Sequence, residues 1–209
     1  TTEEVNIGLD VGLFDERIVF EADAYRSVTS DLLLNVSVPS ASGYETVLTN
    51  IGEVQNTGLE LFLETQNLTG DFSWSTSVNF STNENEVTEL GPGDAPIRSS
   101  GVAGIRHITQ VGSPIGSYYG YKVEGVFQSE QEIQNAPEDM VGDPSPGDLR
   151  FKDVNGDGQI TPDDKTVTGS YQPDFTYGLT NTFQFKGFDL RVFVQGVEGR
   201  DILNLTNRH

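Results

Sequence analysis

Residues 5–13 read VNIGLDVGL, and apolar and polar positions alternate along this stretch without a break. Every odd position is a valine, leucine or isoleucine, and every even position is asparagine, aspartate or glycine. A period of two is typical of a β-strand whose two faces meet different surroundings. The stretch therefore predicts a strand with one wholly apolar face.

The same alternation recurs along the chain. The further segments are 18–25, 59–64, 72–80, 175–185 and 188–195. A tilted strand needs about nine to eleven residues to cross the hydrocarbon of a bilayer, which is close to the length of most of these runs. The pattern predicts an all-β fold of antiparallel, membrane-spanning strands.

The connections between the alternating segments differ in length. Those at 14–17, 67–71 and 186–187 are short, whereas those at 27–56 and 81–174 are long and rich in Gly, Pro and charge. Outer-membrane barrels have short periplasmic turns and long extracellular loops. We therefore expect a segment of an antiparallel transmembrane β-barrel with long extracellular loops.

A secreted β-sandwich that binds calcium and recognises carbohydrate or protein is the alternative, because its strands also alternate. Two features favour the barrel. Aromatic residues gather near the strand ends, as in an interfacial girdle, and the polar faces are small and uncharged or acidic, as a wet lumen allows.

The composition excludes several classes of protein. Lys plus Arg number 12 against 32 Asp plus Glu, for a formal charge of −20, which argues against nucleic-acid binding. The chain has no cysteine and no run of eighteen apolar residues, and no signal peptide is expected within these residues. It begins at Thr1, and we read it as an excerpt or a processed product.

Residues 153–164 read DVNGDGQITPDD, which follows the pattern of a calcium-binding loop with glycine at its sixth position. A hard divalent cation takes six to eight oxygen ligands, and alternate positions of such a loop supply them. The predicted ligands are the side chains of Asp153, Asn155 and Asp157, the backbone carbonyl of Gln159 and the carboxylate of Asp164. Ile160 should point inward.

The loop departs from the usual pattern, because Asp164 replaces the closing glutamate and no long helices flank it. We expect a static, structural calcium site, in which Asp163 is an alternative to Asp164 and Thr161 acts through water. A solvated acidic turn without a bound ion is the other reading of this loop.

Other candidate chemistry is thin, and we do not expect an enzyme. The two histidines, His107 and His209, lack the context of a catalytic triad or a zinc site. Glu60 and Glu64 face one side of a strand and could imitate the carboxylate pair of a glycosidase, although polar lumen residues explain them more simply.

Two local elements lie inside the second long connection. Residues 117–127 are expected to form a strand, in which Tyr118 to Tyr121 are an interfacial anchor in preference to a surface for stacking sugar rings. A short helix should begin at Ser129 and end by Pro137.

Several segments together resemble one family, the SusC/RagA-type TonB-dependent transporters of the Bacteroidota outer membrane. The segments that carry the resemblance are 31–34 with 39–43, 50–61, 147–152 running into the calcium loop, 169–178 and 187–190. The likeness covers nearly the whole chain and corresponds to the later part of such a barrel.

The resemblance implies a piece of a large plugged barrel, with the plug domain and the TonB box outside these 209 residues. Proteins of this family import oligosaccharides or peptides across the outer membrane of Gram-negative bacteria. They act with a SusD-like lid lipoprotein and are driven by TonB. The cargo and the identity of the lid do not follow from the sequence.

Overall fold

The computed structural model describes residues 1–37, 43–44, 46–99 and 106–202. The chain forms two compact units. Residues 1–97, 109–115 and 171–209 make the first, which we call the sheet unit, and residues 98–108 and 116–170 make the second, the loop unit. No helix in the described ranges is long and apolar enough to cross a bilayer.

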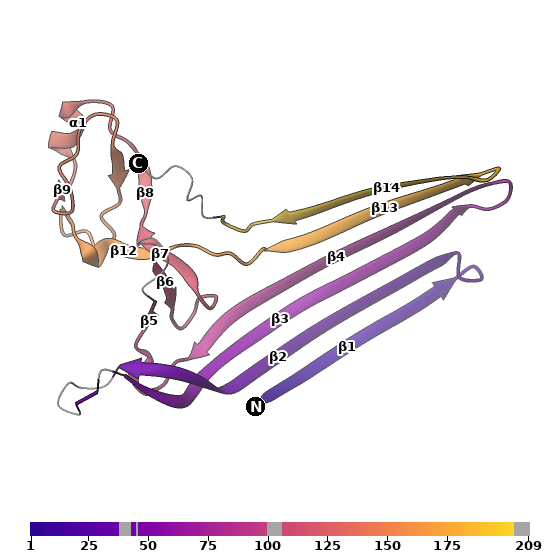
Figure 1. Cartoon of the computed structure of the whole chain (residues 1–209), viewed down its shortest axis with the longest axis horizontal. Helices are drawn as coiled ribbons and strands as arrows, with labels where there is room; N and C mark the ends of the chain where they lie inside the picture. Colours follow the sequence, from indigo (N-terminus) through magenta and orange to yellow (C-terminus); the bar gives the residue numbers. More distant parts are fainter. Residues whose placement is uncertain (38–42, 45, 100–105, 203–209) are drawn as a thin grey trace. The chain divides into compact units, whose positions relative to one another are not determined.

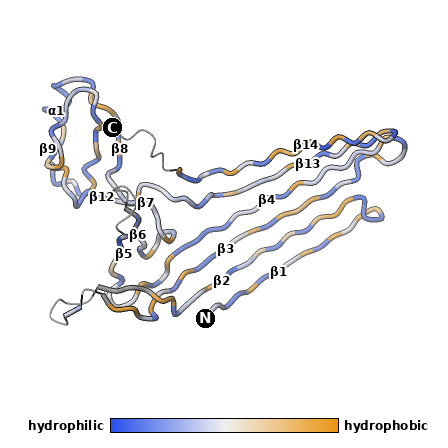
Figure 2. Tube along the Cα trace, viewed as in Figure 1, coloured by the Kyte–Doolittle hydropathy of each residue, from blue (hydrophilic) through white to orange (hydrophobic). Residues whose placement is uncertain are grey.

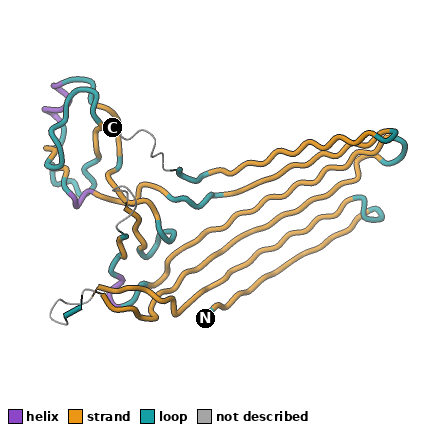
Figure 3. Tube along the Cα trace, viewed as in Figure 1, coloured by secondary structure: helices purple, strands orange, loops and turns teal. Residues whose placement is uncertain are grey.

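The sheet unit contains six strands in the order β1-β2-β3-β4-β13-β14, and every neighbouring pair is antiparallel (Figures 1 and 3). The strands are β1 (Thr2–Leu13), β2 (Ile18–Ser37), β3 (Thr46–Leu68), β4 (Phe72–Glu89), β13 (Phe175–Phe185) and β14 (Phe188–Glu198). The three short turns lie at one end of the sheet (Figure 1). These strands and turns confirm the prediction from the alternating segments.

The register aligns residues of like character across the strands. Leu9 lies opposite Ala22, and Ala22 opposite Leu61, while on the other side of the sheet Asp23 lies opposite Glu60. The sheet therefore has an apolar face and a polar face, and Figure 2 shows the alternation along each strand. Side chains of the apolar face are open, with Ile7 74% and Phe188 79% exposed.

One prediction about the connections was wrong. Residues 27–37, 46–56 and 81–89, which were assigned to long loops, continue strands β2, β3 and β4. Polar cross-strand pairs hold these extensions: Asn85 lies opposite Asn56 and donates from Nδ2 to its Oδ1 over 2.8 Å. Such pairs stabilise a sheet without producing apolar alternation.

The extended part of the sheet unit has a small apolar core. Val54, Val87 and Leu90 are buried there, and Leu32, Ile97 and Ile115 pack against them. The 3-10 helix η2 (Pro92–Asp94) follows β4, and the backbone N–H of Leu90 donates to the Asp94 carboxylate over 3.0 Å. This core gives the strand extensions a packing partner outside the six-stranded ladder.

The loop unit is made of short elements. They are β6 (Arg106–Thr109), β7 (Ser117–Tyr121), β8 (Val123–Val126), α1 (Glu130–Asn135), β9 (Glu138–Asp139), β10 (Leu149–Phe151), β11 (Gln159–Ile160), η3 (Pro162–Asp164) and β12 (Lys165–Gly169), with β5 (Ile97–Arg98) at its boundary. Four of them form the sheet β12-β7-β6-β5, and β10-β8 and β11-β9 are separate pairs.

Two predictions within the loop unit have different outcomes. The single strand expected over 117–127 is two strands, because β7 pairs with β12 and β8 pairs with β10. The helix is confirmed: the Ser129 side chain caps α1 by accepting from the Glu132 N–H, and the helix ends before Pro137.

Candidate functional site

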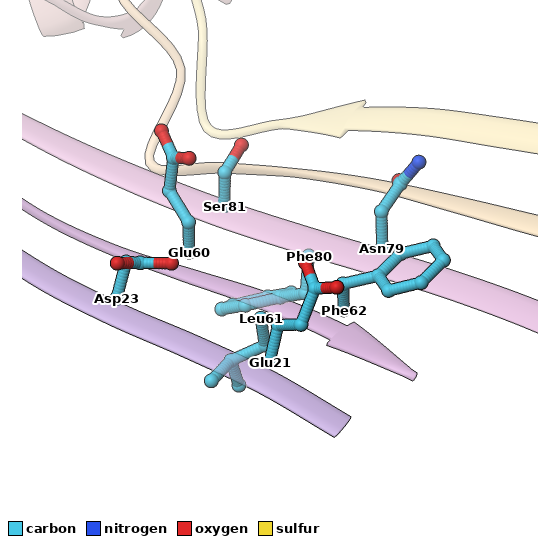
Figure 4. Close-up of a pocket in the computed structure, with 8 residues that line it drawn as sticks. All are labelled: Glu21, Asp23, Glu60, Leu61, Phe62, Asn79, Phe80 and Ser81. Atoms are coloured by element: carbon cyan, nitrogen blue, oxygen red, sulfur yellow. The ribbon is translucent and has the colours of Figure 1, made fainter. Parts of the chain in front are cut away.

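The polar face of the six-stranded sheet is the broadest candidate surface. A hollow of about 280 Å³ opens on it, formed by β2, β3 and β4 (Figure 4). Its lining residues are Glu21, Asp23, Glu60, Leu61, Phe62, Asn79, Phe80 and Ser81. Because alternation sends every second side chain to this face, the carboxylates of Glu21, Asp23 and Glu60 come from neighbouring strands to one surface.

Carboxylates lie opposite one another on this face. Asp10 is the cross-strand partner of Glu21, and Asp23 is the partner of Glu60. Like charges placed directly opposite destabilise a sheet, so this arrangement is unfavourable for the sheet by itself. The one basic residue of β1 to β4 is Arg26, which donates to Gln55. The face therefore carries a negative potential that disfavours anions.

Two glycines of the polar face make room for large side chains. A Cβ on Gly58 would collide with the ring of Tyr25, and one on Gly8 would lie 2.6 Å from Asp23 Oδ1. The Tyr25 hydroxyl reaches across Gly58 and donates to Asn83 Oδ1 over 3.0 Å. These contacts fix the orientation of the aromatic ring on the polar face.

The predicted calcium loop lies wholly in the loop unit. The Asp153 carboxylate accepts from the backbone N–H groups of Gly156 (2.6 Å) and Gly158 (2.8 Å). Asn155 Oδ1 accepts from the Asp157 N–H over 2.9 Å, and Asp157 Oδ1 from the Gln159 N–H over 2.8 Å. The structure thus brings the three side chains predicted as ligands into one tight turn.

The side chain of Asp164, the last residue of the loop, lies inside it. It is fully buried, and its carboxylate accepts from the backbone N–H groups of Val154 (2.8 Å) and Thr161 (2.7 Å). The backbone hydrogen bond from Thr161, with those from Val154 and Asn155, lowers the pKa of Asp164 against the opposing effect of desolvation. Asp164 is therefore held as an anion.

The neighbouring residues of this loop are also placed. Ile160 is buried, as predicted. The Thr161 side chain caps η3 by accepting from the Asp163 N–H over 3.2 Å. Within the described part of the chain, no three His, Asp or Glu side chains cluster as a metal site, and calcium binding by this loop stays a prediction.

The other residues singled out by the sequence have packing contacts. His107 Nδ1 lies 2.9 Å from the Gly116 carbonyl oxygen, and its ring packs on Tyr118 at 5.3 Å. The Tyr121 ring packs against Phe151 at a tilt of 37°, with 5.1 Å between the ring centres, and Lys165 Nζ lies 4.9 Å from the Tyr121 ring centre. His209 lies outside the described residues.

A polar network on the apolar face was missed from sequence. Asn181 Oδ1 accepts from Trp74 Nε1 (2.9 Å) and Thr76 Oγ1 (2.8 Å), and Thr76 Oγ1 accepts from Asn67 Nδ2 (2.7 Å). The available signal was the interruption of the apolar series by Thr76 and Asn181 in neighbouring strands. In this network the polar side chains that interrupt the apolar face form hydrogen bonds with one another and with Trp74.

Comparison with known proteins gives a consistent result. A family model described as "TonB dependent receptor-like, beta-barrel" matches residues 1–205. The chain is 39% identical over 99% of its length to TonB-dependent receptor P3 of Formosa agariphila, covering 21% of that protein. It is 31% identical over 88% of its length to TonB-dependent receptor SusC of Bacteroides thetaiotaomicron, covering 18% of that protein.

Solved structures show the same likeness. The RagAB peptide transporter structure aligns with a TM-score of 0.72 and 25% identity, over 95% of this chain and 21% of the other. The open-open state of the RagAB peptide importer aligns with a TM-score of 0.74 and 24% identity, over 95% and 20%. The chain thus spans about a fifth of the proteins it resembles.

Proposed function

This chain belongs to the TonB-dependent receptor β-barrel family, and from that membership we propose that its six-stranded sheet is part of the wall of an outer-membrane importer. The apolar face contacts the hydrocarbon of the membrane, and the polar face lines the lumen. Strands β1 and β14, which end the sheet, pair with further strands of the same barrel.

The observation that carries this proposal is the exposure of the apolar face. On the inner strands β3 and β13, Leu59, Leu63 and Leu179 are 36–38% exposed, and on the end strands β1 and β14 Ile7 and Phe188 are 74% and 79% exposed. Rows of exposed apolar side chains are unfavourable in water. Moving one such side chain fully into an apolar medium lowers the free energy by about 1.5–3 kcal/mol. A bilayer supplies that medium.

Spin labels at paired positions of the full-length receptor test this proposal. Leu9→Cys and Leu190→Cys report on the apolar face, and Asp10→Cys and Asp189→Cys are the matched neighbours on the polar face. We expect oxygen in the membrane to relax the first pair and a water-soluble nickel complex to relax the second. Equal access of the nickel complex to all four would refute the assignment of faces.

We also propose that the whole receptor imports oligosaccharides or peptides, acts with a SusD-like lid lipoprotein and is driven by TonB. The names of the relatives support this proposal, since one is SusC and another is a peptide transporter. Co-purification of a lipoprotein with the full-length receptor and TonB-dependent growth on oligosaccharide or peptide are the measurements. Growth that is unchanged when the receptor gene is deleted would contradict import.

Within the loop unit, we propose that residues 153–164 hold one structural calcium ion. Asp153, Asn155 and Asp157 would supply side-chain oxygens and Gln159 a carbonyl, while Asp164 closes the loop. The convergence of these side chains in one turn supports the proposal, because calcium requires oxygen ligands at this spacing. Bound calcium would stiffen the loop and support docking of the lid.

Calcium stoichiometry of the full-length receptor is the test. Asp153→Ala with Asp157→Ala should remove one calcium per chain, whereas Asp143→Ala, an exposed aspartate of the same unit, should leave the stoichiometry unchanged. An unchanged stoichiometry in the double variant would end the calcium proposal and leave the wall proposal intact.

A further inference from the structure

A second hollow lies at the end of the sheet where the three short turns gather. It has a volume of about 360 Å³ and is lined by Phe14, Arg17, Ile18, Thr65, Gln66 and Asn67. These residues come from the β1–β2 turn, the first position of β2 and the end of β3. The hollow is separate from the one on the polar face, with which it shares no lining residue.

The backbone of the β1–β2 turn creates this hollow. Phe14, Asp15 and Glu16 have φ angles of 59°, 56° and 62°, which place three successive non-glycine residues in the left-handed region. Residues other than glycine rarely adopt that backbone conformation, so the surrounding contacts must stabilise it. One result is that Phe14 is 73% exposed and forms a wall of the hollow.

Arg17 is positioned by the end of β3. Its Nη2 donates to the carbonyl oxygens of Gln66 (3.1 Å) and Asn67 (3.5 Å), and its own carbonyl accepts from the Gln66 N–H over 2.8 Å. Among the described residues, its Nε and Nη1 groups make no hydrogen bond. These N–H groups remain available to a ligand in a hollow that neither Asp15 nor Glu16 lines.

The hollow continues into the apolar face of the sheet. Ile18 lies opposite Leu13 on one side and Thr65 on the other, so its side chain belongs to the row that begins with Leu13. A cation thus stands at the end of an apolar surface. Guanidinium groups bind phosphate oxygens by strong, charge-assisted hydrogen bonds, and apolar side chains bind hydrocarbon.

We infer that this hollow is a binding site for a phospholipid of the membrane leaflet at the turn end of the sheet. The Arg17 guanidinium binds the headgroup phosphate, and the acyl chains lie along Phe14, Ile18 and the apolar row beyond. The inference rests on the proposed function, because the apolar face must contact lipid for an acyl chain to extend along it.

Lipid binding to the purified full-length receptor in detergent tests this site. Native mass spectrometry would follow the titration of dioctanoyl phosphatidylglycerol, with glycerol phosphate as the soluble headgroup and inorganic phosphate as the simple anion. We expect Arg17→Gln to weaken lipid binding by roughly tenfold, which corresponds to about 1.4 kcal/mol. Arg17→Lys should lose less, because it keeps the charge.

Two further variants separate this site from general effects. Lys186→Gln removes a cation from another turn at the same end of the sheet, where Lys186 Nζ lies 5.2 Å from the Phe185 ring centre, and should leave binding unchanged. Phe14→Ser should weaken the lipid but not glycerol phosphate. Equal losses in Arg17→Gln and Lys186→Gln, or equal binding of lipid and glycerol phosphate, would overturn the inference.

The same experiment distinguishes failure of the site from failure of the proposed wall. A full-length receptor that stays monomeric in water without detergent would refute the wall proposal before any lipid is added. If the receptor requires detergent and circular dichroism shows that it is folded, the wall proposal stands. Equal lipid binding by the unchanged receptor and the Arg17→Gln variant would then refute only the lipid site.

Discussion

The sheet unit and the loop unit differ in the interactions that hold their strands and turns in place. In the sheet unit, long backbone ladders hold strands of 11 to 23 residues and leave most apolar side chains open. In the loop unit, strands of two to five residues pair over short ladders, and carboxylates that accept from nearby backbone N–H groups hold the turn at 153–164. Long ladders therefore hold one unit, whereas short ladders and local polar contacts hold the other.

The largest expected effect separates the two faces of the sheet unit. Leu9→Arg places a charge on the apolar face and should destabilise the full-length receptor in phospholipid vesicles by about 2–4 kcal/mol, the cost of arginine near the middle of a bilayer. Its neighbour Asp10→Arg, on the polar face opposite Glu21, should cost little. Equilibrium unfolding in urea measures both, and equal losses would remove the distinction between the faces.

In the loop unit, Asp164→Ala should produce the next largest effect. The substitution leaves the N–H groups of Val154 and Thr161 without their acceptor, so local opening of the loop should become easier. Hydrogen exchange of these two amides should accelerate, while amides of β3 and β4 keep their protection. Asp143→Ala is the exposed control, and faster exchange throughout the sheet unit would show that the units are not independent.

The Asp164 carboxylate also predicts how the stability of the loop changes in acid. The folded pKa of Asp164 lies below its unfolded value, so its contribution to stability is present above the unfolded pKa of about 3.9 and is lost as pH falls through the lower folded pKa. Amide protection of Val154 and Thr161 should therefore persist at pH 5 and disappear only in stronger acid. Loss of protection already near pH 5 would contradict the lowered pKa.

Gly58 in the sheet unit and Gly120 in the loop unit differ in the space available for a Cβ atom. Gly58→Ala in β3 must displace the Tyr25 ring and should destabilise the sheet unit by about 1–3 kcal/mol, as overpacking does. Gly120→Ala in β7 meets no atom within 4 Å and should be tolerated. Urea unfolding measures both, and the Tyr25→Ala background should remove most of the Gly58→Ala effect. Persistence of the full effect there would exclude the ring as its cause.

The smallest expected effect is at the helix of the loop unit. Ser129→Ala removes the side-chain acceptor of the Glu132 N–H, which also donates to the Ser129 carbonyl, and should cost about 1 kcal/mol locally. Hydrogen exchange of Glu132 reports this change, and Ser129→Asp, which retains an acceptor, should restore protection. No change in Glu132 exchange in either variant would mean that α1 is held by its tertiary contacts alone.

The sequence was sufficient for the part of the sheet in which the two faces differ. Alternation identified the strands around Leu9, Phe80 and Leu190 because one side of each is apolar and the other polar. It failed above this region, where pairs such as Asn56 with Asn85 stabilise the ladder with polar residues on both sides. Periodicity reports a contrast between faces, and apart from the small core around Val54 and Val87 little contrast exists there.

The candidate sites were predictable to different degrees. The spacing of oxygen-bearing side chains in 153–164 predicted a calcium loop, and calcium binding stays a prediction. The hydrogen bonds from the Val154 and Thr161 N–H groups to Asp164 are specified by no spacing rule. The hollow beside Arg17 depends on left-handed backbone at Phe14, Asp15 and Glu16. Phe and Glu do not favour that conformation, and although Asp is enriched in it, one aspartate does not predict three successive left-handed residues.

One consequence follows from the pairing of β4 with β13. Ser81 and Thr176 are 95 positions apart, yet their hydroxyl oxygens lie 2.8 Å from each other on adjacent strands. Most of the residues between them, 98–108 and 116–170, form the loop unit, while the rest belong to the sheet unit. Evolution can lengthen, shorten or replace such an insert while the hydrogen-bond ladder on either side stays in register, and a designer could close the same gap with a hairpin turn.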